Sequence, residues 1–307
     1  MFRRTVVPLV FDKYIVSDPK ALPTRPLGNT GHKVTLFALG GEGVLRTHGR
    51  TQEAVRVIHR ALDHGVNYCD TAPAYESSMD YYGAALGERR REIFLASKTH
   101  NRTRDGSLRL LEDSLRRLRT DHLDLWQLHD LRTMRDLDVI FSKGGAIEAL
   151  VEARDEGRVR FLGITGHYDP TILLEAMRRF DFDTVLVALN AADVHRLSFV
   201  ETVLPEAARR GMGVIGMKVY GAGTLVRRHG LFGRVGESGI STDEAMGYVL
   251  SLPSVSTVVI GCQMPAEVDD NTRIAREFVP FDAPMMCNLE NRTQRKSASV
   301  TGYKRPA

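Results

Sequence analysis

Short, nearly continuous apolar runs recur along the chain and alternate with amphipathic stretches. Runs that are apolar on both faces are typical of parallel strands covered by helices. Between them, segments such as 51–65, 107–121 and 145–160 carry apolar residues at helical spacing. Alternation of this kind over about 250 residues predicts an α/β fold, a closed (β/α)8 TIM barrel. The eight runs are residues 34–40, 66–70, 93–98, 123–129, 161–167, 184–190, 213–219 and 257–262.

A doubly wound open sheet is the alternative architecture. That fold normally carries a G-x-G-x-x-G motif after its first strand, whereas the first run here leads into GGEGVLR, which lacks the spacing. The barrel is therefore favoured. The segment TRPLGNTGHKVTLFALG predicts a β-hairpin that turns at Asn29-Thr30-Gly31 and closes the bottom of the barrel.

The expected organisation is an N-terminal extension over residues 1–22, a barrel domain over 23–280 and a C-terminal loop or tail over 281–307. The last expectation comes from the polar and basic stretch ENRTQRKSASVTGYKRPA. The oligomeric state cannot be inferred from the sequence.

Composition excludes several classes of protein. Hydrophobic residues make up 43% and charged residues 26%, the balance of a soluble globular protein. The net charge of +4 is spread along the chain without a basic, aromatic-rich face, so no nucleic-acid partner is expected. No stretch approaches the ~18 apolar residues of a membrane span. The three cysteines form no CxxC pair, which argues against a metal site and favours a reducing, cytoplasmic location.

Ionisable side chains follow three consecutive runs. Asp70 ends the second run, Lys98 the third and His129 the fourth, while Tyr75 lies in the loop after Asp70. Each residue alone has a structural explanation, such as a loop cap or a satisfied core histidine. Because the carboxyl ends of barrel strands share one face, where active sites lie, the four together predict a catalytic site.

The residue types suit proton transfer to a carbonyl oxygen. A lysine at the strand mouth must be paired, and Asp70 is the available anion. The Lys98 ammonium should lower the pKa of Tyr75, which could then protonate an alkoxide, while His129 hydrogen-bonds the oxygen. A hydride donor is also required, and since no amino acid supplies one, a nicotinamide cofactor is expected.

Four segments carry a family resemblance. One segment resembles the signature of the aldo-keto reductase family, namely GVNYCDTAPAYESSMDYYGAALGERRREIFLASKT. A second, LDLWQLHD, resembles the His-bearing strand of that family. GRVRFLGITGH and LGNTGHKVTLFALGGEG resemble two further family segments. The resemblance implies that Asp70, Tyr75, Lys98 and His129 form the catalytic tetrad on a (β/α)8 barrel. It implies reduction of an aldehyde or ketone by NADPH or NADH, or the reverse oxidation of an alcohol or sugar.

The resemblance also implies a nicotinamide across the ends of strands five to seven, where this chain departs from the family. Thr165 and Gly166 replace the usual Ser-Asn pair, and Asn190 could substitute for a family Gln. Met217 stands where the family stacks an aromatic ring on the nicotinamide. Lys218 could reach a cofactor phosphate or a substrate anion, or be a plain surface lysine.

The pyrophosphate and adenosine are implied to lie near the loops after strands seven and eight. GCQMPAEVDDN resembles a family segment in which basic residues hold the 2′-phosphate of NADPH, but this chain has Gln263 and Glu267 there. The choice between NADP(H) and NAD(H) therefore stays open. The implied contacts are Gly221, Ala222, Gly223, Gly261, Cys262, Gln263, Glu267, Asp270 and Asn271.

Two alternatives to a reductase remain within the same family: a cofactor-binding regulatory barrel with little turnover, and a lyase or epimerase on a retained barrel. The intact tetrad argues against the regulatory role. The loops after strands one and four carry charged residues that suit a polar or anionic small-molecule substrate, such as a sugar or a phosphorylated aldehyde. These residues are Glu42, Arg46, His48, Asp130, Arg132 and Arg135.

Overall fold

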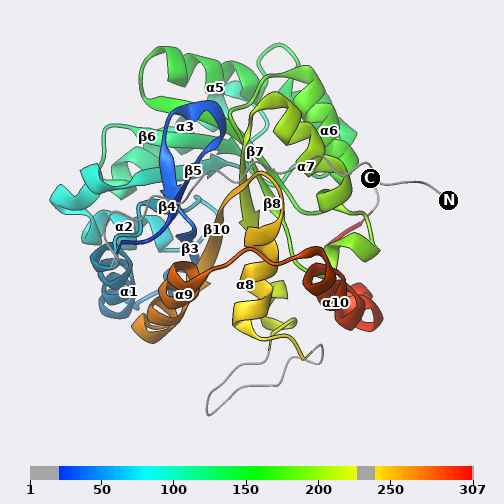
Figure 1. Cartoon of the computed structure of the whole chain (residues 1–307). Coiled ribbons are helices and arrows are strands. Elements are labelled where there is room, and N and C mark those ends of the chain that lie inside the picture. The colour runs from blue at the N-terminus through cyan, green and yellow to red at the C-terminus, as the bar shows by residue number, and fades with distance from the viewer. Residues whose placement is uncertain (1–20, 227–238, 306–307) are drawn as a thin grey trace.

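A computed structural model describes residues 21–226 and 239–305 (Figure 1). Its centre is a closed barrel of eight parallel strands, in which the last strand pairs with the first and helices surround the whole. The predicted (β/α)8 barrel is therefore confirmed. The strands are β3 (Phe37–Gly43), β4 (Tyr68–Asp70), β5 (Phe94–Thr99), β6 (Leu123–Leu128), β7 (Val159–Gly166), β8 (Thr184–Ala188), β9 (Gly213–Met217) and β10 (Val255–Cys262).

The predicted hairpin is also present, as β1 (Thr24–Pro26) paired antiparallel with β2 (Lys33–Thr35). It packs against the start of β9, where Asn29 N–H donates to Gly211 O at 2.9 Å. Gly28 has a φ of +51° and lies so close to this strand that a Cβ would approach the Gly213 nitrogen at 2.2 Å. The apolar run 34–40 proves to be two elements, because the chain leaves the hairpin at Leu36 before β3 begins.

The helices lie outside the strands and present apolar faces to them. In α1 the buried residues are Ala54, Val57, Ile58, Ala61 and Leu62, which recur at helical spacing. The helices are α1 (Thr51–Asp63), α2 (Ser78–Ala85), α3 (Arg104–Leu118), α4 (Met134–Ile140), α5 (Ala146–Asp155), α6 (Pro170–Arg179), α7 (Phe199–Arg210), α8 (Thr242–Ser251), α9 (Pro265–Glu277), α10 (Ala283–Thr293) and α11 (Ser297–Val300). The short 3-10 helices are η1 (Gly28–Thr30), η2 (Val44–Arg46), η3 (Gly87–Glu92), η4 (Asp193–His195), η5 (Gly221–Gly223) and η6 (Gln294–Lys296).

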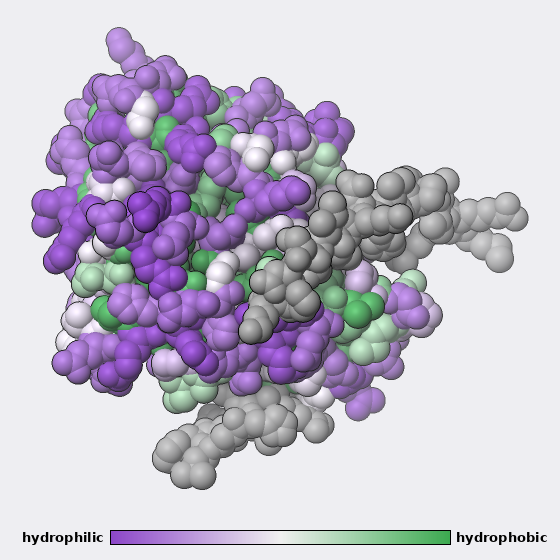
Figure 2. All heavy atoms as spheres, turned by 60° about the vertical axis from the view of Figure 1, so that its left-hand side comes forward, coloured by the Kyte–Doolittle hydropathy of each residue, from purple (hydrophilic) through white to green (hydrophobic). Residues whose placement is uncertain are grey.

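Two apolar layers hold the barrel together. A large one fills the space between strands and helices, and a smaller one, which includes Tyr68, Leu125, Leu186 and Ile215, fills the barrel interior. The face seen in Figure 2 is mostly hydrophilic, with small and separate hydrophobic patches. Within the described ranges, no helix has both the length and the hydropathy needed to cross a bilayer.

The C-terminal region corrects one prediction. Residues 281–307 were expected to be a loop or tail, but they contain α10, η6 and α11, and α10 lies beside α8 (Figure 1). Asp282 caps α10 by accepting a hydrogen bond from Met285 N–H at 2.9 Å. Leu289 is fully buried against the barrel. The proposed division into extension, barrel and tail stays a prediction, and residues 1–20 of the extension lie outside the described residues.

Candidate active site

The four predicted catalytic residues lie at the ends of three neighbouring strands. Asp70 is the last residue of β4, Lys98 is the penultimate residue of β5, and His129 directly follows β6. Tyr75 lies in the loop between β4 and α2. Because β4, β5 and β6 are consecutive in the barrel, their carboxyl ends bring the four side chains together.

Lys98 is completely buried and forms an ion pair with Asp70, as the sequence predicted. Its ammonium also donates to Thr71 O at 2.9 Å, and Gln127 Nε2 donates to Asp70 Oδ2 at 3.1 Å. Burial lowers the pKa of Lys98, but the neighbouring Asp70 and Tyr75 more than offset this, so its pKa lies above the ordinary value. The lysine therefore stays charged inside the barrel mouth.

Tyr75 lies between Lys98 and His129. The Lys98 ammonium is 4.8 Å from the centre of the Tyr75 ring, and the His129 ring meets it edge-on at 5.6 Å and 86°. Lys98 lowers the pKa of Tyr75, as the sequence predicted, but it does not set the net shift. Burial raises this pKa more than Lys98 lowers it, so it lies above the ordinary value of the phenol. The phenol thus holds its proton until a strong base, such as an alkoxide, is present.

His129 is a neutral imidazole. Burial is the main cause that lowers its pKa to about 2, and the positive charge of Lys98 adds to the effect. A neutral ring keeps one N–H, which can donate to an oxygen atom beside Tyr75. His129 is therefore suited to orient a carbonyl group but not to supply a proton at neutral pH.

The loops after β3 and β6 contribute charged residues around Tyr75. Arg46 lies 5.3 Å from the Tyr75 ring centre and donates to Glu42 and Glu76, each at 2.9 Å. Asp130 pairs with Arg132, and His167 Nδ1 lies 3.2 Å from Asp130 Oδ1. His48 Nδ1 lies 2.9 Å from Ser77 Oγ, and Arg135 is exposed on α4.

The candidate cofactor residues at the ends of β7 and β8 differ in whether they have a hydrogen-bonding group free for a ligand. Thr165 Oγ1 accepts from Asp130 N–H at 2.8 Å, which leaves its own proton free to donate. Gly166 packs tightly, because a Cβ there would lie 3.0 Å from Leu173. The amide of Asn190 is fully engaged, since Nδ2 donates to Lys218 O at 3.3 Å and to the Tyr303 hydroxyl at 3.1 Å. Its Oδ1 accepts from Ala192 N–H at 3.0 Å.

At the end of β9, Met217 packs into the barrel interior and Lys218 follows with a φ of +55°. The Lys218 ammonium lies 5.1 Å from the ring centre of Tyr303, which comes from the C-terminal segment. Sequence reasoning missed Tyr303. Neither periodicity nor motif points to it, since its position depends on a contact across more than a hundred residues.

The turns after β9 and β10 hold the remaining candidates. Gly221 and Gly223 adopt positive φ angles in η5, and a Cβ at Gly261 would approach the Glu42 carbonyl carbon at 2.6 Å. The Cys262 thiol is buried beside Asn271, whose Oδ1 accepts from the Tyr220 hydroxyl at 2.7 Å. Asp270 is exposed.

Gln263 and Glu267 contact each other at the start of α9. Gln263 N–H donates to Glu267 Oε2 at 2.7 Å, so a carboxylate of the chain itself occupies this donor. The other donors around the mouth, the Thr165 hydroxyl and the Lys218 ammonium, suit a ligand rich in oxygen acceptors such as a dinucleotide. Among the described residues, no group of three or more His, Cys, Asp or Glu side chains is placed to hold a metal ion.

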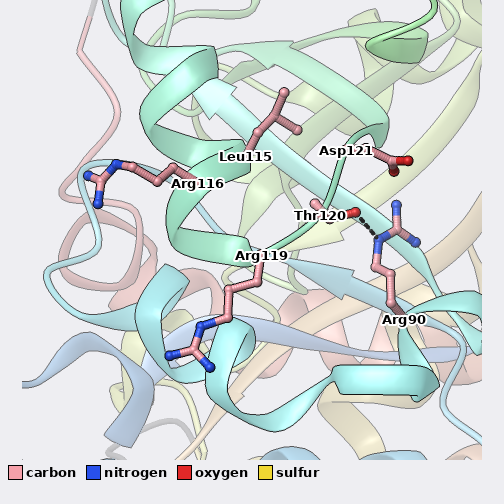
Figure 3. A pocket seen from close by; sticks show the side chains of 6 residues that line it. All are labelled: Arg90, Leu115, Arg116, Arg119, Thr120 and Asp121. Carbon is pink, nitrogen blue, oxygen red and sulfur yellow. Dashed lines mark hydrogen bonds between the residues drawn. The ribbon is translucent and has the colours of Figure 1, made fainter.

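A surface depression elsewhere is unrelated to this chemistry (Figure 3). Its lining comes from the η3 region and from the end of α3 with the turn before β6. It therefore lies toward the amino end of β6, opposite the tetrad. Arg90 crosses it to donate to Thr120 Oγ1 at 3.2 Å. The lining residues are Arg90, Leu115, Arg116, Arg119, Thr120 and Asp121.

Comparison with known proteins agrees with the barrel fold. Residues 37–238 match the model of the Aldo/keto reductase family. L-galactose dehydrogenase of Arabidopsis thaliana is 27% identical over 294 residues, covering 83% of this chain and 88% of the plant protein. Aldo-keto reductase AKR11C1 from Bacillus halodurans, in its holo form, superposes with a TM-score of 0.74 at 26% identity, covering 88% of this chain and 95% of that one. An aldo-keto reductase from Klebsiella pneumoniae in complex with NADPH gives a TM-score of 0.70 at 22% identity over 87% and 94% of the two chains.

The chain belongs to the Aldo/keto reductase family. It is an oxidoreductase, and because members of this family use NAD(P)H, the predicted family and cofactor class are confirmed.

Proposed function

We propose that this protein reduces an aldehyde or ketone with NAD(P)H, or oxidises the corresponding alcohol or sugar, with Tyr75 as the general acid. The observation that carries the proposal is the position of the Tyr75 phenol between a buried ammonium and a neutral imidazole. A reduced nicotinamide supplies the hydride, which no side chain can provide.

Each member of the tetrad has a separate role. Tyr75 donates its proton to the carbonyl oxygen as the oxygen becomes an alkoxide. Lys98 stabilises the phenolate that remains, and its ion pair with Asp70 keeps it charged. His129 stays neutral and donates a hydrogen bond that orients the carbonyl group.

We further propose a polar, sugar-like substrate and a cytoplasmic location. The charged pairs Arg46–Glu42 and Arg132–Asp130 around the mouth suit a ligand with many hydroxyl groups. The relative named L-galactose dehydrogenase acts on such a molecule. The three free cysteines, of which Cys287 is exposed, agree with a reducing compartment.

Cofactor titration and turnover together test this function. We expect NADH or NADPH to bind with a Kd in the micromolar range, as is common for enzyme ligands, about 1 μM to 1 mM. Absorbance at 340 nm should fall when sugar aldehydes are added, and more slowly with aromatic aldehydes. Cofactor binding without turnover on any aldehyde, ketone, sugar or alcohol would instead support the regulatory barrel.

We propose that NADH is preferred to NADPH. The phosphate sites of barrels lie at the loops after the seventh and eighth strands and at a helix N-terminus. Here that N-terminus belongs to α9, where Glu267 already accepts from Gln263 N–H. A 2′-phosphate would meet this carboxylate, whereas a ribose hydroxyl could donate to it.

Glu267→Gln should therefore improve NADPH binding selectively. At a site exposed to water, removing one negative charge near a phosphate dianion should improve the binding free energy of NADPH by about 1–2 kcal/mol. This corresponds to roughly a tenfold fall in its Kd. The control is Glu277→Gln, which removes the same charge about 15 Å further along α9 at 1.5 Å per residue. Fluorescence titration checks both variants. A wild-type protein that binds NADPH more tightly than NADH would contradict the preference.

A further inference from the structure

The barrel mouth carries a second polar cluster that faces the tetrad. The tetrad comes from β4, β5 and β6, whereas His167, Asn190 and Lys218 follow β7, β8 and β9. Tyr303 joins this cluster, with its ring 5.7 Å from that of His167. The two clusters adjoin, because His167 Nδ1 lies 3.2 Å from Asp130 Oδ1 in the loop after β6.

Lys218 carries the positive charge of this cluster, and among the residues that the structure describes no carboxylate forms an ion pair with it. The nearest carboxylates are engaged elsewhere: Glu42 binds Arg46, and Asp130 binds Arg132. His167 contributes no charge, because burial lowers its pKa to about 4. Burial also lowers the pKa of Lys218. A half-buried ammonium without an anion is unfavourable, and a bound anion would relieve it.

Contacts of both its backbone and its side chain hold Lys218 in position. Its backbone has a φ of +55°, a strained value that is frequent at functional sites, and its carbonyl accepts from Asn190 Nδ2. Its ammonium lies over the Tyr303 ring, and the Tyr303 hydroxyl accepts from the same Asn190 amide. The next residue, Lys304, is fully buried and paired with Asp193. The Lys218 backbone is thus held by Asn190, and its ammonium lies against a ring on a segment that Lys304 anchors.

We propose that Lys218, positioned by Tyr303 and Asn190, forms a subsite for a phosphate or carboxylate group on the side of the barrel mouth opposite the tetrad. The inference deepens the proposed function and rests on it, since it assigns a negatively charged group to the reductase substrate. The same chemistry could come from a cofactor phosphate, and the experiment separates the two sources.

The first measurement uses inorganic phosphate as the probe and does not depend on turnover. Phosphate is titrated by calorimetry, at fixed ionic strength, into the full-length protein with and without bound NAD⁺. Charge-assisted hydrogen bonds contribute about 1.5–3 kcal/mol, so Lys218→Met should raise the Kd for phosphate at least about tenfold. Lys33→Met, an exposed lysine of the bottom hairpin, is the control for loss of charge. Phosphate that binds the NAD⁺ complex occupies a substrate subsite, whereas phosphate that competes with NAD⁺ occupies a cofactor subsite.

The second measurement compares D-glyceraldehyde with its 3-phosphate. Lys218→Met should lower the ratio of kcat/KM for the phosphorylated over the neutral aldehyde at least about tenfold relative to Lys33→Met, with Lys218→Arg retaining most of it. The inference is overturned if phosphate binds wild type and Lys218→Met equally and the ratio is unchanged. If the wild-type protein shows no turnover, the proposed function is contradicted. The phosphate titration still decides whether the subsite exists.

Discussion

Tyr75→Phe is expected to lower kcat/KM by about 10²- to 10⁴-fold, the usual contribution of a general acid. The change removes one hydroxyl from a ring that Lys98 and His129 hold in place. Because the ring itself remains, the Kd for the nicotinamide cofactor should stay within about threefold of the wild-type value, less than 1 kcal/mol. Stopped-flow turnover and fluorescence titration measure the two quantities on the same preparation.

The matched control is Tyr81→Phe on α2. Tyr81 loses a hydroxyl that donates to Thr47 O at 2.9 Å and accepts from Arg50 N–H at 3.0 Å, away from the tetrad. Its loss should affect stability more than turnover. A Tyr75→Phe variant with activity within tenfold of Tyr81→Phe would rule out Tyr75 as the acid.

The raised pKa of Tyr75 determines how pH affects proton donation from Tyr75 to the carbonyl oxygen. A phenol with a pKa above its ordinary value near 10 stays protonated throughout the physiological range. As a proton donor in reduction it is therefore available at low pH and is lost only when pH rises through that higher pKa. The reverse oxidation needs the phenolate and gains from rising pH. Burial thus favours carbonyl reduction at neutral pH.

The strands and the tetrad could be predicted because their signals are local. A parallel strand buried on both faces must be apolar throughout, so each appears as a run in the sequence. Asp70, Lys98 and His129 end such runs, and the barrel places consecutive strand ends side by side. The sign of the pKa shift at Tyr75 was not accessible in this way. It depends on the total burial of the phenol, which distant loops such as that of Arg46 create.

The C-terminal region shows where sequence reasoning failed and why. Its basic composition favours a tail, but the sequence also carries signals for α10, namely Asp282 as an N-cap, Pro284 in the first turn and the pair Met285–Leu289 at helical spacing. The contact between Lys304 and Asp193 could not have been found from any local pattern. It joins residues 111 positions apart, and a lysine in a polar stretch resembles a solvent-exposed one.

Lys304→Met should destabilise the protein by about 3–5 kcal/mol, because it leaves the buried Asp193 carboxylate without its cation. Both side chains are fully buried. Lys304 also donates to Arg196 O at 2.8 Å and to Leu197 O at 3.0 Å, so this ammonium makes several of the bonds between the C-terminal segment and the loop after β8. Urea denaturation measures the change, with Lys33→Met, at an exposed position, expected within about 0.5 kcal/mol of wild type.

The double variant Asp193→Asn with Lys304→Met separates charge from packing. If the destabilisation comes from an uncompensated carboxylate, removing the charge at Asp193 should restore at least about half of the lost stability. Equal destabilisation of the single and double variants would show that Lys304 acts through packing alone. In both variants the segment that carries Tyr303 loses the contacts of the Lys304 ammonium with the loop after β8. If Lys304→Met weakens phosphate binding and the double variant does not restore it, global stability cannot be the cause. The position of Tyr303 would then be what keeps Lys218 in place.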